Sequence, residues 1–188
     1  MHYDQQLSEL IAVAEATRAL APQVEAAARA MATCLKAGGK LMTCGNGGSA
    51  TDAMHLAEEL TGRYQEDRPA LAALCLNADS SALTCIGNDF GYGAIFARQV
   101  EALGKPGDVL IGFTTSGNSP NVLSAFDAAR QRSITTILVS GKDGGTAAGT
   151  CDHEIIVPSH STARIQEIHT FILHQWLEFI EADLFGLA

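Results

Sequence analysis

The chain has 188 residues and a formal net charge of −9 at pH 7. That length suits one domain with a substantial core, and the acidic balance without clustered Lys and Arg argues against a nucleic acid partner. Hydrophobic residues make up 47% of the chain, which is typical of a folded protein, yet no apolar run reaches the ~20 residues of a membrane span.

The chain begins with two helices rich in Ala, Leu and Glu, predicted over 4–18 and 23–37 on either side of Ala21-Pro22. Leu7 and Ile11 belong to an apolar stripe at helical spacing on the first of them. Such a stripe packs either on its own domain or on a partner subunit, and we favour the partner.

Short apolar runs without polar alternation predict buried strands at 40–44, 70–76, 109–113, 135–139 and 154–157. Helices are predicted between and after them at 49–61, 80–86, 92–103, 120–131 and 163–182. Strands that alternate with helices in this way indicate a parallel sheet covered on both faces. The predicted fold is α/β, a three-layer α/β/α sandwich with a five-stranded parallel sheet preceded by the N-terminal helices. We expect a single domain over residues 1–188.

Two polar loops with glycine follow predicted strands. The first, Gly45-Asn46-Gly47-Gly48-Ser49, leads into a helix with Ser49 as the expected N-cap. The second, Thr114–Ser119, carries four hydroxyls, on Thr114, Thr115, Ser116 and Ser119. Parallel strands present their carboxyl ends at one edge, so the two loops can share a site. Hydroxyls and helix N-termini suit a phosphate monoester, although each loop alone is also compatible with an ordinary turn or cap.

A second constellation offers acid–base and metal-binding groups. His55 and Glu59 are four residues apart and share a helix face, whereas Glu58 is expected to point off that face. Gln166 and His174 lie on broadly the same side of the last predicted helix. These four side chains form a candidate divalent metal site; His and carboxylate suit zinc, while Gln is an uncommon ligand. The alternative is a surface ion pair.

The role of several other residues stays open at the sequence level. Arg63 and Arg68 either meet an anionic ligand or are solvated. Asn88-Asp89, in a predicted turn, either bind sugar hydroxyls or act as a cap. The small-residue stretch 141–149 is favoured as a plain connection between strands.

Five cysteines without a Cys-x-x-Cys pair indicate buried reduced thiols rather than a disulfide framework. The N-terminal sequence shows no secretory signal. We therefore expect a cytoplasmic protein, with neither nucleic acid nor membrane among its partners.

Six segments form a set of motifs in chain order: Cys44–Ser49, Asp52–Tyr64, Gly87–Gly91, Thr115–Ser119, Gly141–Gly145 and Arg164–Glu167. Together they resemble the phosphoheptose isomerases of the sugar isomerase (SIS) domain superfamily, over nearly the whole chain. The segment His55–Arg63 is specific to that family, whereas the loop Thr115–Ser119 is shared more widely. The chain departs at Thr114, where the family usually has Ser, and at Ala163, where some members have Asp.

The resemblance implies an aldose–ketose isomerase that converts sedoheptulose 7-phosphate to D-glycero-D-manno-heptose 7-phosphate through an enediol. That reaction is the first step of heptose synthesis for lipopolysaccharide or other surface glycans. The resemblance also implies one zinc ion per subunit and a homotetramer with active sites between subunits, to which the N-terminal helices at about 4–37 contribute packing.

Matched by motif, Glu59 and His174 correspond to the catalytic acid–base pair of the family. The corresponding zinc ligands are His55, Glu59, Gln166 and His174. The corresponding substrate-binding residues are Asn46, Gly47, Gly48, Ser49, Glu59, Asn88, Asp89, Thr114, Thr115, Ser116, Ser119 and Gln166.

Two alternatives stay open. Some SIS proteins of this size bind the replication initiator and lack isomerase activity, but they also lack the residues equivalent to Glu59 and His174. The other alternative, an isomerase of a different sugar phosphate, is not excluded by the motifs.

Overall fold

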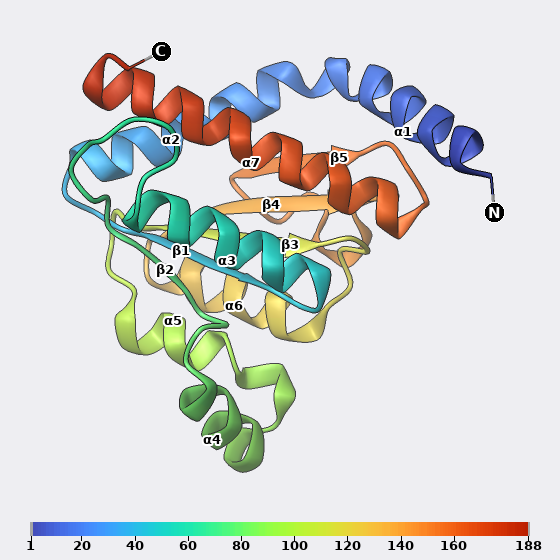
Figure 1. Cartoon of the computed structure of the whole chain (residues 1–188). Coiled ribbons are helices and arrows are strands. Elements are labelled where there is room, and N and C mark those ends of the chain that lie inside the picture. Colours follow the sequence, from blue (N-terminus) through green and yellow to red (C-terminus); the bar gives the residue numbers. More distant parts are fainter. Residues whose placement is uncertain (1, 188) are drawn as a thin grey trace.

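The computed structural model describes residues 2–187 and contains a five-stranded sheet with the order β2-β1-β3-β4-β5 (Figure 1). All neighbouring strands are parallel. The strands are β1 (Leu41–Gly45), β2 (Ala73–Cys75), β3 (Val109–Thr114), β4 (Thr135–Gly141) and β5 (His153–Val157). β1 and β3 are buried along their whole length, which explains their unbroken apolar sequence. The predicted five-stranded parallel sheet is confirmed.

Helices cover both faces of the sheet, so the predicted three-layer α/β/α arrangement is confirmed (Figure 1). On one face lie α2 (Ala21–Lys36), α3 (Gly48–Thr61) and α7 (Thr162–Phe185), with a core that includes Met31, Leu56, Leu60 and Trp176. On the other lie α5 (Ala97–Leu103) and α6 (Pro120–Gln131), with a core that includes Phe96 and Phe126.

The first helix, α1 (Tyr3–Thr17), extends away from the sheet and buries a single residue, Thr17 (Figure 1). A short 3-10 turn, Arg18–Leu20, connects it to α2, and Pro22 lies in the first turn of α2. Arg164 of α7 holds α1 in place by donating to the carbonyl oxygen of Gln6 at 2.9 Å. Packing of α1 against a partner subunit stays a prediction.

Two local predictions are wrong. Ser49 is not an N-cap, because Gly47 takes a positive φ of 58° and caps α3, which leaves Ser49 buried in the first turn. Residues 87–89 are not a turn, because α4 continues over Ser80–Phe90. That helix ends where Gly91 adopts a φ of 83° and a ψ of 159°, a positive-φ conformation that glycine reaches without steric cost.

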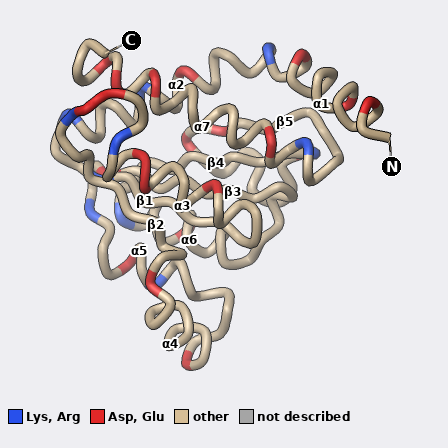
Figure 2. Tube along the Cα trace, viewed as in Figure 1, with Lys and Arg blue, Asp and Glu red and all other residues tan. Residues whose placement is uncertain are grey.

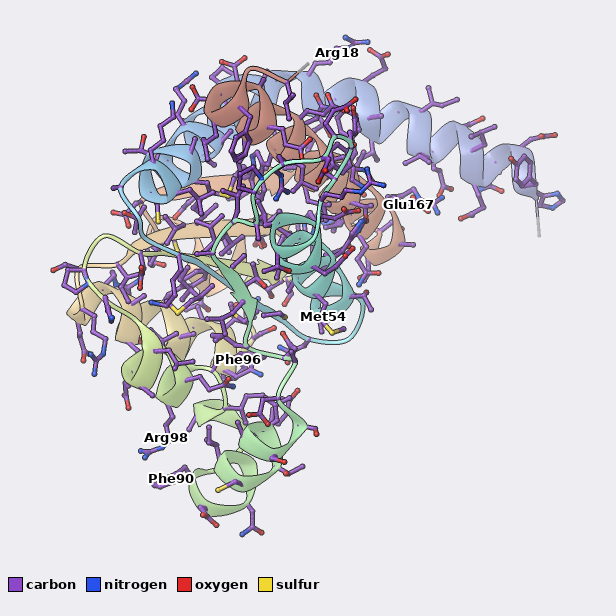
Figure 3. The ribbon with its side chains drawn as sticks, turned by 60° about the vertical axis from the view of Figure 1, so that its left-hand side comes forward. Arg18, Met54, Phe90, Phe96, Arg98 and Glu167 are labelled. Atoms are coloured by element: carbon purple, nitrogen blue, oxygen red, sulfur yellow. The ribbon has the colours of Figure 1, made fainter. Side chains whose placement is uncertain are left out.

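No residue of α4 is buried within the described chain, so α4 packs only loosely against the rest of the protein. Figure 3 shows Phe90, at its end, beside Arg98 of α5, and the Arg98 guanidinium carbon lies 3.9 Å from the Phe90 ring centroid. This cation–π contact holds the end of α4 against α5.

Lys and Arg are spread over the trace rather than gathered along one helix or sheet edge (Figure 2). Among residues 2–187, no helix combines the length and apolarity needed to cross a bilayer. The expected lack of a nucleic acid partner stays a prediction.

His169 fastens α7 to the sheet. Its side chain is fully buried against Phe113, and its Nε2 lies 3.0 Å from the carbonyl oxygen of Ser140 at the end of β4. Burial lowers the pKa of His169 from 6.5 to about 4, and the bond to Ser140 opposes that shift.

This lowered pKa predicts an acid-dependent loss of stability. Between pH 6.5 and about pH 4 only the unfolded chain takes up the His169 proton, so the free energy of unfolding falls by roughly 3 kcal/mol as pH decreases. Above pH 6.5 the group contributes no pH dependence. In His169→Gln, which keeps a donor without titrating, urea unfolding between pH 7 and pH 4 should give a shallower decline. If the free energy of unfolding declines equally in the wild type and in His169→Gln, the lowered pKa of His169 is not the cause.

Candidate functional site

α3 and α7 lie side by side in the same direction (Figure 1). They meet through successive pairs of residues. The pairs are Gly48 with Gln166, Asp52 with Thr170, and His55 with His174. Because Gln166, Thr170 and His174 are spaced by four residues, they form one stripe along α7. The structure therefore gathers candidate residues from distant parts of the sequence along one line of contact.

The end of this line holds a group of side chains whose chemistry is suited to binding a metal ion. His55 Nε2 lies 3.3 Å from Glu59 Oε1, and the rings of His55 and His174 meet edge to face at 5.1 Å. Two ligand atoms each about 2.0–2.1 Å from a tetrahedral zinc ion lie roughly 3.3 Å apart. The spacing of His55 from Glu59 and the chemistry of the three side chains fit zinc, and His174 meets this pair through the ring of His55.

The structure corrects the expectation that Glu58 points off this face. His55, Glu58 and Glu59 each offer a ligand atom within 4.8 Å of the others, although Glu58 is exposed. Glu58 is therefore an additional candidate ligand at the solvent side of the group.

Gln166 lies at the other end of the contact line. A Cβ atom built on Gly48 would lie 2.3 Å from its Nε2, so the amide packs directly against the start of α3. Eight residues of helix correspond to about 12 Å along the axis, which separates the backbone of Gln166 from that of His174. The structure places His55 against both Glu59 and His174, and it places Gln166 beside the first polar loop.

Asp52 lies between these two ends and was not singled out from the sequence. Its Oδ1 accepts the Thr170 hydroxyl at 2.9 Å, while Oδ2 is buried and has no hydrogen-bond partner among residues 2–187. Burial raises the pKa of Asp52, against the opposing effects of Thr170 and His55. The i, i+4 spacing of Thr170 from Gln166 and His174 is the pattern that would have revealed this pair.

The first polar loop is fixed by amide side chains. Asn46 exchanges two hydrogen bonds with Asn121 of α6, at 2.9 and 2.8 Å, and its Oδ1 also accepts the Tyr92 hydroxyl at 2.9 Å. Asn77 bonds both the N–H and the carbonyl of Gly45, at 3.2 and 2.9 Å. The loop is thereby held at the junction of β1 with α6.

The second polar loop, Thr114–Ser119, lies at the adjacent strand end, because β1 and β3 are neighbours in the sheet. The hydroxyls of Thr114 and Ser119 are 3.1 Å apart, and Thr115, Ser116 and Ser119 are partly exposed. The arrangement presents several hydroxyls beside the N-terminus of α6, where an anion is favoured.

The stretch 141–149 is more than a connection. The N–H of Ala147 donates to Gly117 at 3.0 Å, and Asn118 accepts from the N–H and hydroxyl of Thr146 at 2.9 and 2.8 Å. A Cβ on Gly117 would lie 1.7 Å from the carbonyl oxygen of Gly144, so glycine is required there. This stretch supports the hydroxyl-rich loop from behind.

Asn88 and Asp89 lie at the exposed end of α4, where their side chains bond each other at 2.8 Å. The contact from this segment to the Asn46 loop is made by Tyr92. Whether Asn88 and Asp89 bind substrate stays a prediction.

Arg68 neither faces a ligand nor is solvated. Its side chain is fully buried with that of Glu181, with Nε donating to Oε1 at 2.9 Å. Its other nitrogens donate to the carbonyls of Glu59 at 2.7 Å and Leu60 at 2.8 Å. Arg68 thus caps the end of α3 and links it to α7. Arg63 is exposed and donates to the carbonyl of Gln65 at 3.0 Å.

A family model described as the SIS domain matches residues 2–141. The sheet order, the polar loops at the carboxyl ends of β1 and β3, and this match define the chain as an SIS domain protein.

Proteins with high sequence identity to this chain identify a particular family among the SIS domain proteins. Phosphoheptose isomerase from Campylobacter jejuni is 50% identical over 169 residues, which cover 90% of this chain and 91% of the relative. The structure of phosphoheptose isomerase GmhA from Neisseria gonorrhoeae is 43% identical with a TM-score of 0.89, covering 95% of this chain and 96% of that one. A phosphoheptose isomerase structure from Francisella tularensis is 38% identical with a TM-score of 0.92, covering 94% and 95%. The chain belongs to the phosphoheptose isomerase family and is an isomerase.

The contact between Gly48 and Gln166 predicts a substitution that damages the site without unfolding the protein. In Gly48→Ala the new methyl group would displace the flexible end of Gln166, because it would lie 2.3 Å from Nε2. We expect isomerase turnover to fall by about 10-fold or more while the free energy of unfolding changes by less than about 1 kcal/mol. Gly93→Ala is the control, since a Cβ there meets nothing within 4 Å. Equal turnover in Gly48→Ala and Gly93→Ala would show that isomerase turnover does not depend on the position of the Gln166 side chain.

Proposed function

We propose that the chain converts sedoheptulose 7-phosphate to D-glycero-D-manno-heptose 7-phosphate, the first step of heptose synthesis for lipopolysaccharide or another surface glycan. The observation that carries this proposal is that His55 of α3 contacts both Glu59, on the same helix, and His174 of α7. The high identity to phosphoheptose isomerases over most of the chain supports the choice of substrate.

Substrate binding is assigned to the two polar loops and their neighbours. The hydroxyls of Thr114, Thr115, Ser116 and Ser119 would hold the phosphate together with backbone N–H groups. Neutral donors suit a chain whose net charge of −9 repels an anion at long range. The sugar chain would be bound by Asn46, Gly47, Gly48, Ser49, Glu59, Asn88, Asp89 and Gln166.

Proton transfer is assigned to Glu59 and His174. Moving a ketose carbonyl from C2 to C1 requires removal of a proton from C1 and its return at C2, through an enediol. Glu59 would take the proton from carbon, and His174 would move the proton that passes between the sugar oxygens. A positioned general base contributes about 10²–10⁴-fold to the rate.

One zinc ion per subunit is part of the proposal. His55, Glu59 and His174 would hold it, and Gln166 would complete the set by turning its amide away from Gly48. The chemistry that zinc supplies when bound is positive charge near a developing oxyanion.

The proposal predicts that Glu59→Gln and His174→Gln each lower turnover by about 10²-fold or more, because each removes one proton-transfer group. Product formation from sedoheptulose 7-phosphate is followed by NMR with added zinc, after circular dichroism has verified the fold. Glu101→Gln, on the exposed side of α5, is the matched control and should keep wild-type turnover. Near-normal turnover in either site variant would contradict its role, and no product from the wild-type chain would reject the substrate.

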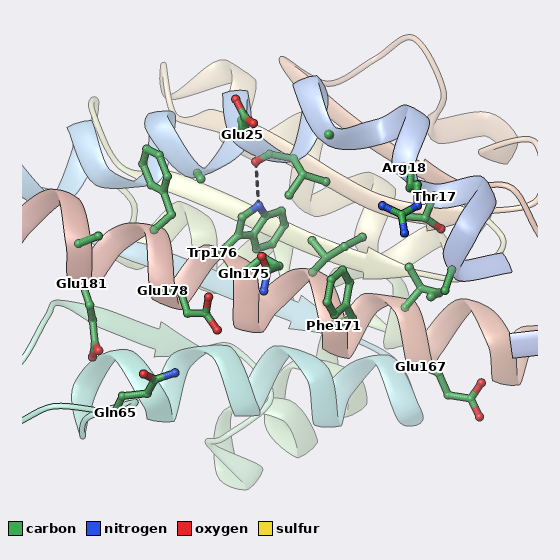
Figure 4. A pocket seen from close by; sticks show the side chains of 18 of the residues that line it. Thr17, Arg18, Glu25, Gln65, Glu167, Phe171, Gln175, Trp176, Glu178 and Glu181 are labelled. Carbon is green, nitrogen blue, oxygen red and sulfur yellow. Dashed lines mark hydrogen bonds between the residues drawn. The ribbon is translucent and has the colours of Figure 1, made fainter. Parts of the chain in front are cut away.

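A homotetramer with active sites between subunits is the proposed assembly. α1, α2 and α7 line a largely apolar groove of about 1130 Å³. Trp176 is among its lining residues, and its indole N–H donates to the carbonyl of Val24 at 3.0 Å (Figure 4). Phe171 in this groove is 55% exposed, and Ile11 on α1 is 54% exposed. Such apolar surface is typical of a subunit interface, and a second copy of the chain is the proposed occupant.

This assembly predicts that Leu7→Glu combined with Ile11→Glu dissociates the tetramer, because charge would enter an apolar contact. Light scattering should give a lower mass than for the wild-type chain, with loss of turnover. Ala16→Glu adds a charge on the opposite, exposed side of the same helix and should leave the mass unchanged. A wild-type chain that is monomeric, or a double variant of unchanged mass, would contradict the assembly.

A further inference from the structure

The imidazole of His174 lies between two other rings. Tyr64 stacks on it with ring centroids 5.6 Å apart and an interplanar angle of 23°, and His55 meets it edge to face at 5.1 Å and 82°. The stacked Tyr64 ring prevents the His174 ring from tilting out of its plane, and the edge of His55 restricts rotation of the His174 ring about its bond to Cβ. Neither the composition of the chain nor the spacing of its motifs points to Tyr64.

The loop that carries Tyr64 is itself held firmly. Glu181 of α7 accepts the N–H of Tyr64 at 3.3 Å and the Nε of Arg68 at 2.9 Å with the same oxygen, Oε1. Arg68 in turn donates to the backbone of Glu59. Tyr64 is therefore fixed both to the end of α3 and to the helix that carries His174.

The contact is made by the ring of Tyr64 and not by its hydroxyl. Among the hydrogen bonds of residues 2–187, none involves the Tyr64 hydroxyl. Phenylalanine would preserve such a stack, whereas leucine would leave an apolar side chain beside His174 without a flat face to stack on it.

We propose that Tyr64 is a positioning residue that fixes the ring plane of His174, a role that rests on the proposed function of His174. A group that transfers a proton must aim one ring nitrogen at the substrate, and small errors of placement reduce rate strongly. A zinc ligand must likewise keep its nitrogen about 2.0–2.1 Å from the ion. Both demands are met only if the imidazole keeps one orientation.

The test compares Tyr64→Leu with Tyr64→Phe in the full-length protein. Zinc affinity of the metal-stripped chain is measured by competition with a chromogenic chelator, and kcat and KM are measured separately. We expect Tyr64→Leu to lose about 10-fold or more in zinc affinity and in kcat, with KM nearly unchanged. Tyr64→Phe should stay within about twofold of the wild type in all three.

Asp67→Asn, an exposed change in the same loop, is the control and should match the wild type. Tyr64→Met replaces Tyr64→Leu if the latter does not fold. Wild-type zinc affinity and kcat in the aliphatic variant, or equal losses in Tyr64→Phe, would overturn the proposal. If the wild-type chain binds no zinc, the metal part of the proposed function is wrong, and the kcat values of the variants then test the role of Tyr64. If the wild-type chain has no turnover, the zinc affinities of the variants test that role.

Discussion

The site depends on the parallel packing of α3 against α7. The hydrogen bond from Thr170 to buried Asp52 fixes how far one helix is displaced along the other. Rotating α7 by one residue, about 100°, would carry His174 away from His55, because the stripe on α7 holds only at a spacing of four residues. The Arg68–Glu181 pair fixes the position of α7 along α3 at the C-terminal end of α3. Removing one partner of such a buried pair typically lowers the free energy of unfolding by about 3–5 kcal/mol.

The sheet supplies the second constraint. The order β2-β1-β3-β4-β5 places β1 beside β3, so the loops that follow them lie at adjacent strand ends although 64 residues of sequence separate them. Asn46 and Asn121 join the two sides, and the stretch 141–149 supports the hydroxyl-rich loop from behind. A site built from amides, hydroxyls and backbone N–H groups suits an acidic chain with few cations.

Much of the fold could be predicted from the sequence, since apolar runs and glycine stops are local; helix 120–131 agrees residue for residue with α6. The sequence misplaces the start of α3 at Gly47 and the end of α4 at Gly91. Several glycines lie near each boundary, and any of them can adopt the positive φ that begins or ends a helix. The side chains that position the site were missed for a different reason. Asp52, Tyr64 and Arg68 act through partners more than 100 residues away. No local pattern reveals the contacts of Tyr64 and Arg68, whereas the four-residue spacing of Thr170 from Gln166 and His174 was the one available sign of the Asp52 contact.

In the proposed site α3 and α7 jointly hold one zinc ion. The most direct test is the zinc affinity of the wild-type chain, His55→Ala, His174→Ala and the double variant. Both single variants should bind more weakly by about 10-fold or more, with losses that do not add, because the two rings serve one ion. Wild-type affinity in His174→Ala would contradict the account. The ion would then be held by α3 alone, through His55, Glu58 and Glu59.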